Sequence, residues 1–271
     1  IEAAVTHFEY GGKRFNLIDT PGYPDFIGQT ISALRGVDTA AIVINAGAGI
    51  EVNTHRVFAE AKNARLGRMI VINKLDSENL DFPALVESIQ EVFGAECVLL
   101  NVPIGLGGKF SGVASTLTPP GDTSGAVIDP AEINESLIES IVMADEAMME
   151  AYLEGNMPTS EQLSKLLVQA VADGGLVPIL CVSGKTGVGL TELLDAMAMC
   201  ALPPTAIRRT AKSAAGEDVE VVADPAGPLV AQVFKTRVDP FVQKLSFIRV
   251  FSGTLKKDTT VPATGARKGL K

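Results

Sequence analysis

The sequence predicts an α/β protein: a doubly wound, mostly parallel sheet carrying an inserted subdomain, followed by the start of an all-β barrel domain. Three observations predict this class. Up to about residue 100, short apolar runs alternate with helical patterns, which is typical of parallel strands joined by right-handed crossover helices. Residues 102–130 interrupt the alternation with many Gly, Pro, Ser and Thr. From Pro228 onward the pattern is β alone.

The elements can be placed in order from periodicity and turn residues. A hairpin that turns at Gly11-Gly12 is expected first, and strands and helices then alternate. The expected strands are 15–18, 39–44, 68–72 and 177–182, and helices are expected to begin at Asp25, Asn53, Asp81, Pro130, Thr159 and Thr191. The helix from Pro130 is predicted to run to Glu154 with one acidic face, interpreted as a solvated surface, with a protein-docking face as the alternative.

Composition restricts the function classes. The 271 residues are 46% hydrophobic and 20% charged, which is typical of a globular chain. A net charge of −9 argues against broad binding to nucleic acid, so no DNA partner is expected. No apolar run approaches the roughly 18 residues of a membrane span, so no membrane partner is expected. Three scattered cysteines fit a reducing cytoplasm. His7 and His55 have no metal-ligand partners in the sequence pattern and are interpreted as surface or strand residues that bind no metal.

The stretch Asp19-Thr20-Pro21-Gly22 directly follows the predicted strand 15–18. Pro21 fixes φ and has no N–H, whereas Gly22 lets its amide approach a ligand oxygen closely. A carboxylate at the carboxyl end of a parallel strand lies where open α/β sheets bind ligands. Asp19 could there hold Mg²⁺ through a water, beside a nucleotide phosphate. An ordinary turn is the alternative.

The stretch Asn73-Lys74-Leu75-Asp76 ends another predicted strand, at the same sheet edge as Asp19. Asp76 could accept hydrogen bonds from both the ring N–H and the exocyclic amino group of guanine. Adenine lacks this donor pair, and the unpaired carboxylate would discriminate by roughly 10⁴-fold. Lys74 could lay its aliphatic stem along the base, and Asn73 could connect neighbouring loops. We expect Asp19 and Asp76 to lie at one rim.

Ser183-Gly184-Lys185 provides a third loop at the same edge, where a backbone N–H could donate to the guanine carbonyl oxygen. The triplet Gly184-Lys185-Thr186 also looks like the end of a phosphate-binding loop. That loop requires a glycine where Ile179 stands, and the strand leaves no room for a phosphate cradle. We therefore reject the phosphate-loop interpretation.

Together these motifs resemble those of translational GTPases, and their order and spacing resemble elongation factor G. The insertion and the barrel start add to the likeness. The segments that carry it are Asp19–Gly22, Asn73–Asp76, Ser183–Lys185, Val102-Pro103-Ile104-Gly105, Phe110-Ser111-Gly112-Val113, Val233-Phe234-Lys235, Asp239-Pro240-Phe241 and Lys244-Leu245-Ser246-Phe247. The resemblance implies a P-loop-NTPase-type fold. The expected domains are a GTP-binding domain over 1–205 with a subdomain inserted at about 101–158, a linker over 206–227, and a truncated β-barrel domain over 228–271.

The resemblance also implies a function: a cytoplasmic, monomeric GTPase with GTP/GDP and Mg²⁺ as ligands, coupling hydrolysis on the ribosome to movement of tRNA and mRNA. The implied nucleotide-binding residues are Asp19, Thr20, Pro21, Gly22, Asn73, Lys74, Asp76, Ser183, Gly184 and Lys185. Asp19 would contact Mg²⁺ through water, and Gly22 would sense the γ-phosphate. The segment from Asp19 into the following helix would be the second switch.

Two departures from the family affect these expectations. The phosphate-binding loop and first switch are absent, so the chain is interpreted as an internal fragment that alone binds GTP weakly and is inactive. Tyr23 stands where the family usually has the histidine that positions the attacking water, and a phenol is not a general base near neutral pH. A branch of elongation-factor-G-like proteins carries this tyrosine. The alternatives are a ribosomal-protection or release-type factor, and a slow or non-hydrolysing GTP-binding regulator.

Overall fold

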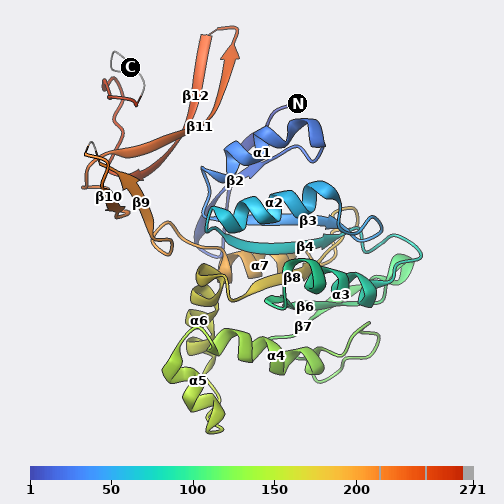
Figure 1. Ribbon diagram of the computed structural model, residues 1–271. Coiled ribbons are helices and arrows are strands. Elements are labelled where there is room, and N and C mark those ends of the chain that lie inside the picture. Colours follow the sequence, from blue (N-terminus) through green and yellow to red (C-terminus); the bar gives the residue numbers. More distant parts are fainter. Residues whose placement is uncertain (214, 242, 265–271) are drawn as a thin grey trace. The chain divides into compact units, whose positions relative to one another are not determined.

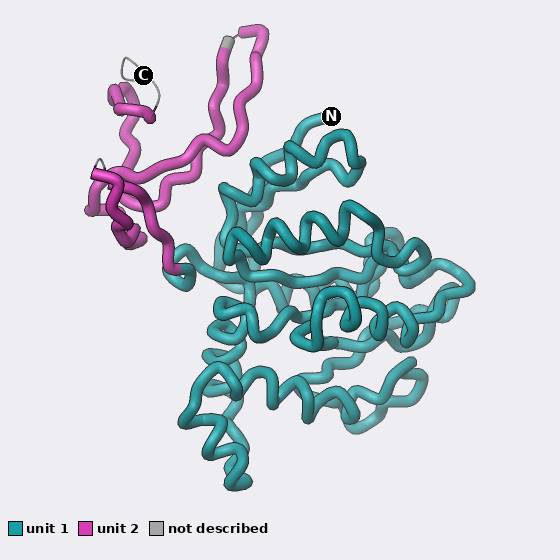
Figure 2. Tube along the Cα trace, in the orientation of Figure 1, with its two compact units in different colours: residues 1–207 teal, residues 208–271 magenta. Residues whose placement is uncertain are grey.

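A computed structural model describes residues 1–213, 215–241 and 243–264 (Figure 1). The chain divides into two compact units, residues 1–207 and residues 208–271 (Figure 2). The first unit contains the α/β core, and the second contains β hairpins. Within the described ranges, no helix is both long enough and apolar enough to cross a lipid bilayer.

A four-stranded parallel sheet forms the centre of the first unit, in the order β3-β4-β8-β5. Its strands are β3 (Thr39–Asn45), β4 (Gly67–Asn73), β5 (Cys97–Leu99) and β8 (Val177–Cys181). Every residue of β8 is buried, as is all of β4 except its last residue, because these strands are covered on both faces. The strands predicted over 39–44, 68–72 and 177–182 are therefore confirmed.

Helices pack on both faces of this sheet. Successive side chains of a strand point to opposite faces, so β4 contributes Ile70 and Ile72 to one apolar cluster and Met69 to the other. Helices α2 (Val52–Asn63) and α3 (Phe82–Phe93) complete the first cluster; α6 (Ser160–Asp173), α7 (Leu190–Cys200) and α4 (Pro130–Val142) complete the second. Figure 1 shows α2 running along β3 and β4. The predicted doubly wound α/β class is confirmed.

The N-terminal hairpin departs from one expectation. Strands β1 (Ala4–Tyr10) and β2 (Lys13–Asp19) form a separate antiparallel sheet, so the strand that ends at Asp19 does not belong to the parallel sheet as predicted. The turn at Gly11-Gly12, with positive φ at both glycines, brings β1 alongside β2 and satisfies its hydrogen bonds locally. Tyr10 Oη donates to Asp195 Oδ1 of α7 at 2.7 Å, which holds the hairpin tip on the core.

The helix predicted to begin at Asp25 begins slightly later. A 3₁₀ turn, η1 (Pro24–Phe26), comes first, and α1 (Ile27–Leu34) follows without a side-chain cap. Pro24 occupies the first position of the 3₁₀ turn, where a missing N–H is tolerated. Asp25 therefore lies within that turn and does not cap α1.

The region predicted as an insertion, about residues 101–158 and called the inserted region below, contains the strands β6 (Asn101–Ile104) and β7 (Gly112–Ser115), a 3₁₀ turn η2 (Gly107–Lys109), and then α4 and α5 (Glu146–Leu153). The single helix predicted from Pro130 to Glu154 is wrong, because it is broken after Val142. Asp145 takes an extended backbone, and its carboxylate accepts a hydrogen bond from the Met148 N–H at 2.9 Å, capping a new helix.

Over its described residues, the second unit contains two antiparallel hairpins, β9 (Arg209–Lys212) with β10 (Asp218–Val221), and β11 (Val230–Asp239) with β12 (Gln243–Ser252). The first hairpin falls within residues 206–227, which were predicted to be a linker, so that prediction is corrected. Its strands alternate only weakly in hydrophobicity, and an ion pair between Lys212 Nζ and Asp218 Oδ1 at 2.8 Å joins them. The predicted β pattern after Pro228 is confirmed over the described residues.

Candidate functional site

Two of the three predicted loops leave the parallel sheet at one edge. Asn73 is the last residue of β4 and lies in register with Asn45, the last residue of β3. On the other side, Ile72 is in register with Cys181, the last residue of β8. Because parallel strands end at the same edge, residues 74–76 and 183–185 begin next to each other.

Asn73 connects these two loops. Its Oδ1 accepts the Gly184 N–H at 2.9 Å and also the Lys74 N–H at 2.7 Å. Lys74 has a φ of 66°, a left-handed conformation that is uncommon outside glycine. The side chain of Asn73 therefore fixes the sharp turn that follows β4 and the position of the neighbouring loop, as the sequence predicted.

Asp76 makes the second connection between the loops. Ser183 Oγ donates to Asp76 Oδ1 at 2.6 Å, and Lys185 Nζ lies 3.6 Å from Asp76 Oδ2. The Asp76 side chain is only 14% exposed, while that of Lys185 is 84% exposed. The Ser183 hydrogen bond lowers the pKa of Asp76, with smaller contributions from its own backbone N–H and from Lys185. The carboxylate is thus held ionised, as an acceptor of a base's N–H groups must be.

The backbone N–H groups of this triplet are less available than expected. Ser183 N–H donates to Val188 O at 2.9 Å, and Gly184 N–H donates to Asn73 Oδ1. Over the described residues, Lys185 N–H is the amide of the triplet with no internal acceptor. A guanine carbonyl oxygen would therefore receive its hydrogen bond from Lys185 N–H, or from Gly184 N–H after Asn73 moves.

The third predicted segment makes a contact with α2 that the sequence did not predict. Asn53, in the first turn of α2, donates from Nδ2 to Gly22 O at 3.0 Å. Because α2 follows the carboxyl end of β3, this bond places Gly22 beside the edge from which Asn73 emerges. Asn53 was expected only as a helix start, and no local pattern distinguishes it from a cap. That Asp19 and Asp76 share one rim stays a prediction, with which the Gly22 contact is consistent.

Asp19 and Tyr23 face the exterior. Asp19 is exposed at the end of β2, and the Tyr23 side chain is 69% exposed. Adding a Cβ to Gly22 would meet no atom within 4 Å, so its surroundings are open. These residues are accessible from solvent, as contact with a ligand would require.

The donor set at Asp19 fits Mg²⁺ held through water. Mg²⁺ keeps several waters and binds one or two carboxylates together with substrate phosphates, so a single exposed carboxylate is compatible with it. Throughout residues 1–213, 215–241 and 243–264, no group of three or more His, Cys, Asp or Glu side chains converges as an all-protein metal site would require. Asp19 is the predicted residue that would hold the ion.

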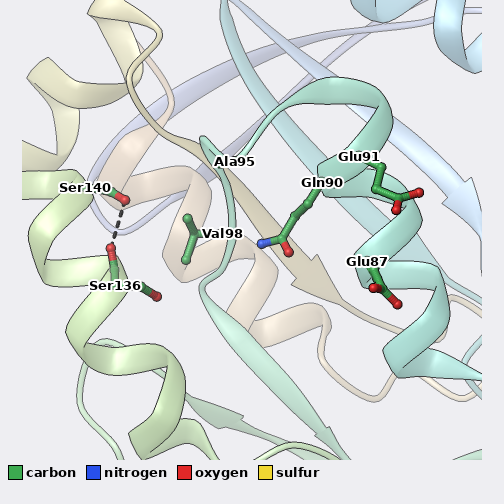
Figure 3. A pocket seen from close by; sticks show the side chains of 7 residues that line it. All are labelled: Glu87, Gln90, Glu91, Ala95, Val98, Ser136 and Ser140. Atoms are coloured by element: carbon green, nitrogen blue, oxygen red, sulfur yellow. Dashed lines mark hydrogen bonds between the residues drawn. The ribbon is translucent and has the colours of Figure 1, made fainter.

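A surface hollow lies elsewhere in the part of the chain that the structure describes. A hollow of about 490 Å³ between α3 and α4 is lined by Glu87, Gln90, Glu91, Ala95, Val98, Ser136 and Ser140 (Figure 3). None of the predicted site residues lines it. Its Gln90 amide already donates to Cys97 O at 2.9 Å, and its glutamates are ordinary helix-surface side chains. The side-chain chemistry at the sheet edge therefore identifies the candidate site better than the size of the hollow does.

Comparisons with known proteins identify a family for most of the chain. The family model described as the elongation factor Tu GTP binding domain matches residues 1–203. A crystal structure of a protein from Thermus thermophilus is similar over 100% of this chain, with 28% sequence identity and a TM-score of 0.79. The match covers 42% of the Thermus chain, so the present chain spans about two fifths of that protein's length.

Proposed function

The chain belongs to the family of the elongation factor Tu GTP-binding domain, and we propose that its sheet edge binds the guanine base of GTP and GDP. Asp76 accepts from the base's ring N–H and exocyclic amino group. Lys74 lies along the ring, Asn73 holds the loops together, and the Ser183–Lys185 loop meets the carbonyl oxygen. The Asp19–Gly22 segment faces the Mg²⁺ and phosphate end.

The observation that carries this proposal is the pair of side-chain bridges between the two loops. Asn73 holds Gly184, and Ser183 holds Asp76, so the groups that would read the base are fixed before it arrives. Such preorganisation reduces the ordering cost of binding. It also keeps the Asp76 carboxylate ionised and directed by its neighbours, which a plain helix entry would not require.

We further propose that the intact protein is a GTPase of the elongation-factor-G type that acts on the ribosome as a cytoplasmic monomer. The support is the region inserted between Asp76 and Ser183, together with the β unit that follows the first unit. A GTP-binding domain over 1–205, a subdomain at about 101–158 and a β-barrel domain after residue 228 would account for this order. GTP hydrolysis would be coupled there to movement of tRNA and mRNA.

The main alternative is a slow or non-hydrolysing GTP-binding regulator. Tyr23 favours it, because a solvent-exposed phenol stands where a histidine would orient water. A ribosomal-protection or release-type factor is a second alternative with the same site. These alternatives share the base-binding edge and differ in what the intact protein does after binding.

Replacing Asp76 by asparagine tests base recognition. In D76N the side-chain amide oxygen could still accept from Ser183 Oγ, but the new NH₂ group would face the guanine amino group and repel that donor. Xanthine carries a carbonyl there and would accept from the NH₂ group. We expect D76N to lose roughly 10²-fold or more in GDP affinity and to gain affinity for xanthosine diphosphate. Displacement of a fluorescent GDP analogue from the intact protein measures both.

Asp173→Asn is the matched control, since it makes the same charge change at an exposed position at the end of α6. It should leave both affinities unchanged. Equal affinity of the unaltered protein for GDP and ADP, or an unchanged GDP affinity in D76N, would rule out the assignment of Asp76 to the base.

A further inference from the structure

The base-binding loop is also in contact with the inserted region. Leu75, whose side chain is completely buried, accepts the Gly107 N–H on its backbone oxygen at 2.9 Å. Three residues later, Glu78 Oε1 accepts the Gly108 N–H at 3.0 Å. Leu75 N–H points the other way and donates to Val182 O at 3.4 Å. The loop that carries Asp76 is therefore held on one side by Val182, directly after β8, and on the other by Gly107 and Gly108.

The segment 105–109 is fixed within the inserted region. Gly105 N–H donates to Gly125 O at 2.9 Å, and Phe110 N–H donates to Gly107 O at 3.0 Å. Gly107 is buried and has a φ of +60°, which glycine adopts at little cost. A Cβ at Gly107 would lie only 2.9 Å from Glu78 Oε2. An alanine at this position would strain the backbone at a positive φ and would require the exposed Glu78 carboxylate to shift away from its contact.

A second anchor joins the inserted region to the other base-binding loop. Asn101, the first residue of β6, is buried, and its Oδ1 accepts the Cys181 N–H at 2.8 Å. Cys181 ends β8, immediately before the segment that delivers Ser183. The inserted region therefore contacts the chain close to both loops of the candidate site.

We propose that Gly107 and Glu78 are positioning residues for guanine recognition, and that the inserted region sets how firmly Asp76 is held against the base. This inference rests on the proposed function. Loosening the 105–109 contact moves Asp76 relative to the ring N–H and the exocyclic amino group. A displacement of about 1 Å at such a contact costs up to roughly 10²-fold. The inserted region then helps to determine base specificity.

The test compares GDP with inosine diphosphate, which has the ring N–H and lacks the exocyclic amino group. The ratio of the two affinities reports how well Asp76 meets that amino group, and a general loss of stability lowers both affinities alike. Displacement of a fluorescent GDP analogue from the intact protein gives both constants. We expect Gly107→Ala to reduce the ratio by about five- to tenfold and to speed GDP release by a similar factor.

Gly155→Ala is the matched control. Gly155 also has a positive φ, +90°, but a Cβ there would meet nothing within 4 Å, and the residue follows α5 far along the chain from both loops. This variant imposes a similar backbone strain and should keep the ratio of the unaltered protein. A reduced ratio in Gly155→Ala equal to that of Gly107→Ala would overturn the proposal.

Glu78 provides a second, independent pair of variants if Gly107→Ala does not fold. Glu78→Gln retains an oxygen that accepts the Gly108 N–H and should keep the ratio within about twofold. Glu78→Ala removes the acceptor, and because Glu78 is exposed we expect a smaller fall, about threefold. An unchanged ratio in Glu78→Ala refutes the positioning role, whether or not Gly107→Ala folds. If the unaltered protein does not prefer GDP to ADP, the proposed function itself fails.

Discussion

Replacing Ser183 by alanine removes one oxygen atom that holds the candidate site together. The hydroxyl donates to Asp76 Oδ1 at 2.6 Å and accepts the Thr186 N–H at 3.2 Å. Ser183 is completely buried, so water cannot easily take the place of the missing oxygen. The variant leaves the Thr186 N–H without an acceptor and the Asp76 carboxylate without its shortest hydrogen bond.

The expected change in the free energy of opening the loop follows from these two hydrogen bonds. Thr186 is exposed, so losing the hydrogen bond of its N–H costs about 0.5–1.5 kcal/mol, the net value of an ordinary hydrogen bond. The bond to the Asp76 carboxylate contributes a similar amount, because that side chain is 14% exposed and solvent screens its charge. We therefore expect the variant to favour opening of the 183–189 loop by about 2 kcal/mol, which corresponds to roughly 30-fold faster amide exchange there. GDP affinity should fall as well, because Ser183 positions Asp76.

Hydrogen exchange followed by mass spectrometry on the intact protein measures the loop directly, without requiring that the whole chain unfold in one step. Ser164→Ala is the control, because its hydroxyl donates to Ser160 O at 2.8 Å on the exposed side of α6. That variant should leave the 183–189 peptide unchanged. Less than a twofold acceleration in Ser183→Ala would refute the reasoning about this hydroxyl.

The effect of Ser183→Ala should also depend on pH. The Ser183 hydrogen bond is the largest cause of the lowered pKa of Asp76. A carboxyl group with a lowered pKa in the folded state stabilises that state above its ordinary pKa, and the stabilisation is lost as the pH falls through the lowered value. The difference in loop stability between the variant and the unaltered protein, measured by amide exchange of the 183–189 peptide, should be largest near neutral pH and should shrink below a pH of about 4. A difference that grows on acidification would contradict this cause.

Three further outcomes are expected. Cys97, Cys181 and Cys200 are buried, and burial raises the pKa of each thiol, to about 12 for Cys97, so Ellman's reagent should react with none of them at neutral pH until denaturant is added. Leu137→Ala removes a completely buried side chain between α4 and α6 and should lower the free energy of unfolding by about 2–5 kcal/mol in calorimetry or denaturant titration. Tyr23→His should raise ribosome-stimulated GTP turnover of the intact protein if the phenol limits hydrolysis; an unchanged rate would argue against slow hydrolysis.

Much of the fold could be predicted from local sequence patterns. The buried strands and the positions of their loops follow from short apolar runs followed by polar residues, since a strand covered on both faces can hardly be encoded otherwise. The loop-connecting role of Asn73 was also predictable, because a side-chain amide at a strand end has few other partners. Two predictions failed because the local sequence signal was weak. The break after Val142 depends on a single aspartate cap, and the hairpin of 209–221 has too weak an alternation to register as strand.

Residue types and their places at strand ends were enough to predict which side chains would bind a guanine base, because only a few side chains have the required donors and acceptors. They could not show that Asn53 holds Gly22, or that Gly107 comes to lie against Glu78. Those contacts join segments far apart in the chain, and no local pattern records them. They depend on how the whole first unit packs: the loops after β4 and β8 leave one edge of the parallel sheet, whereas the segment after β2 reaches α2 from a separate sheet.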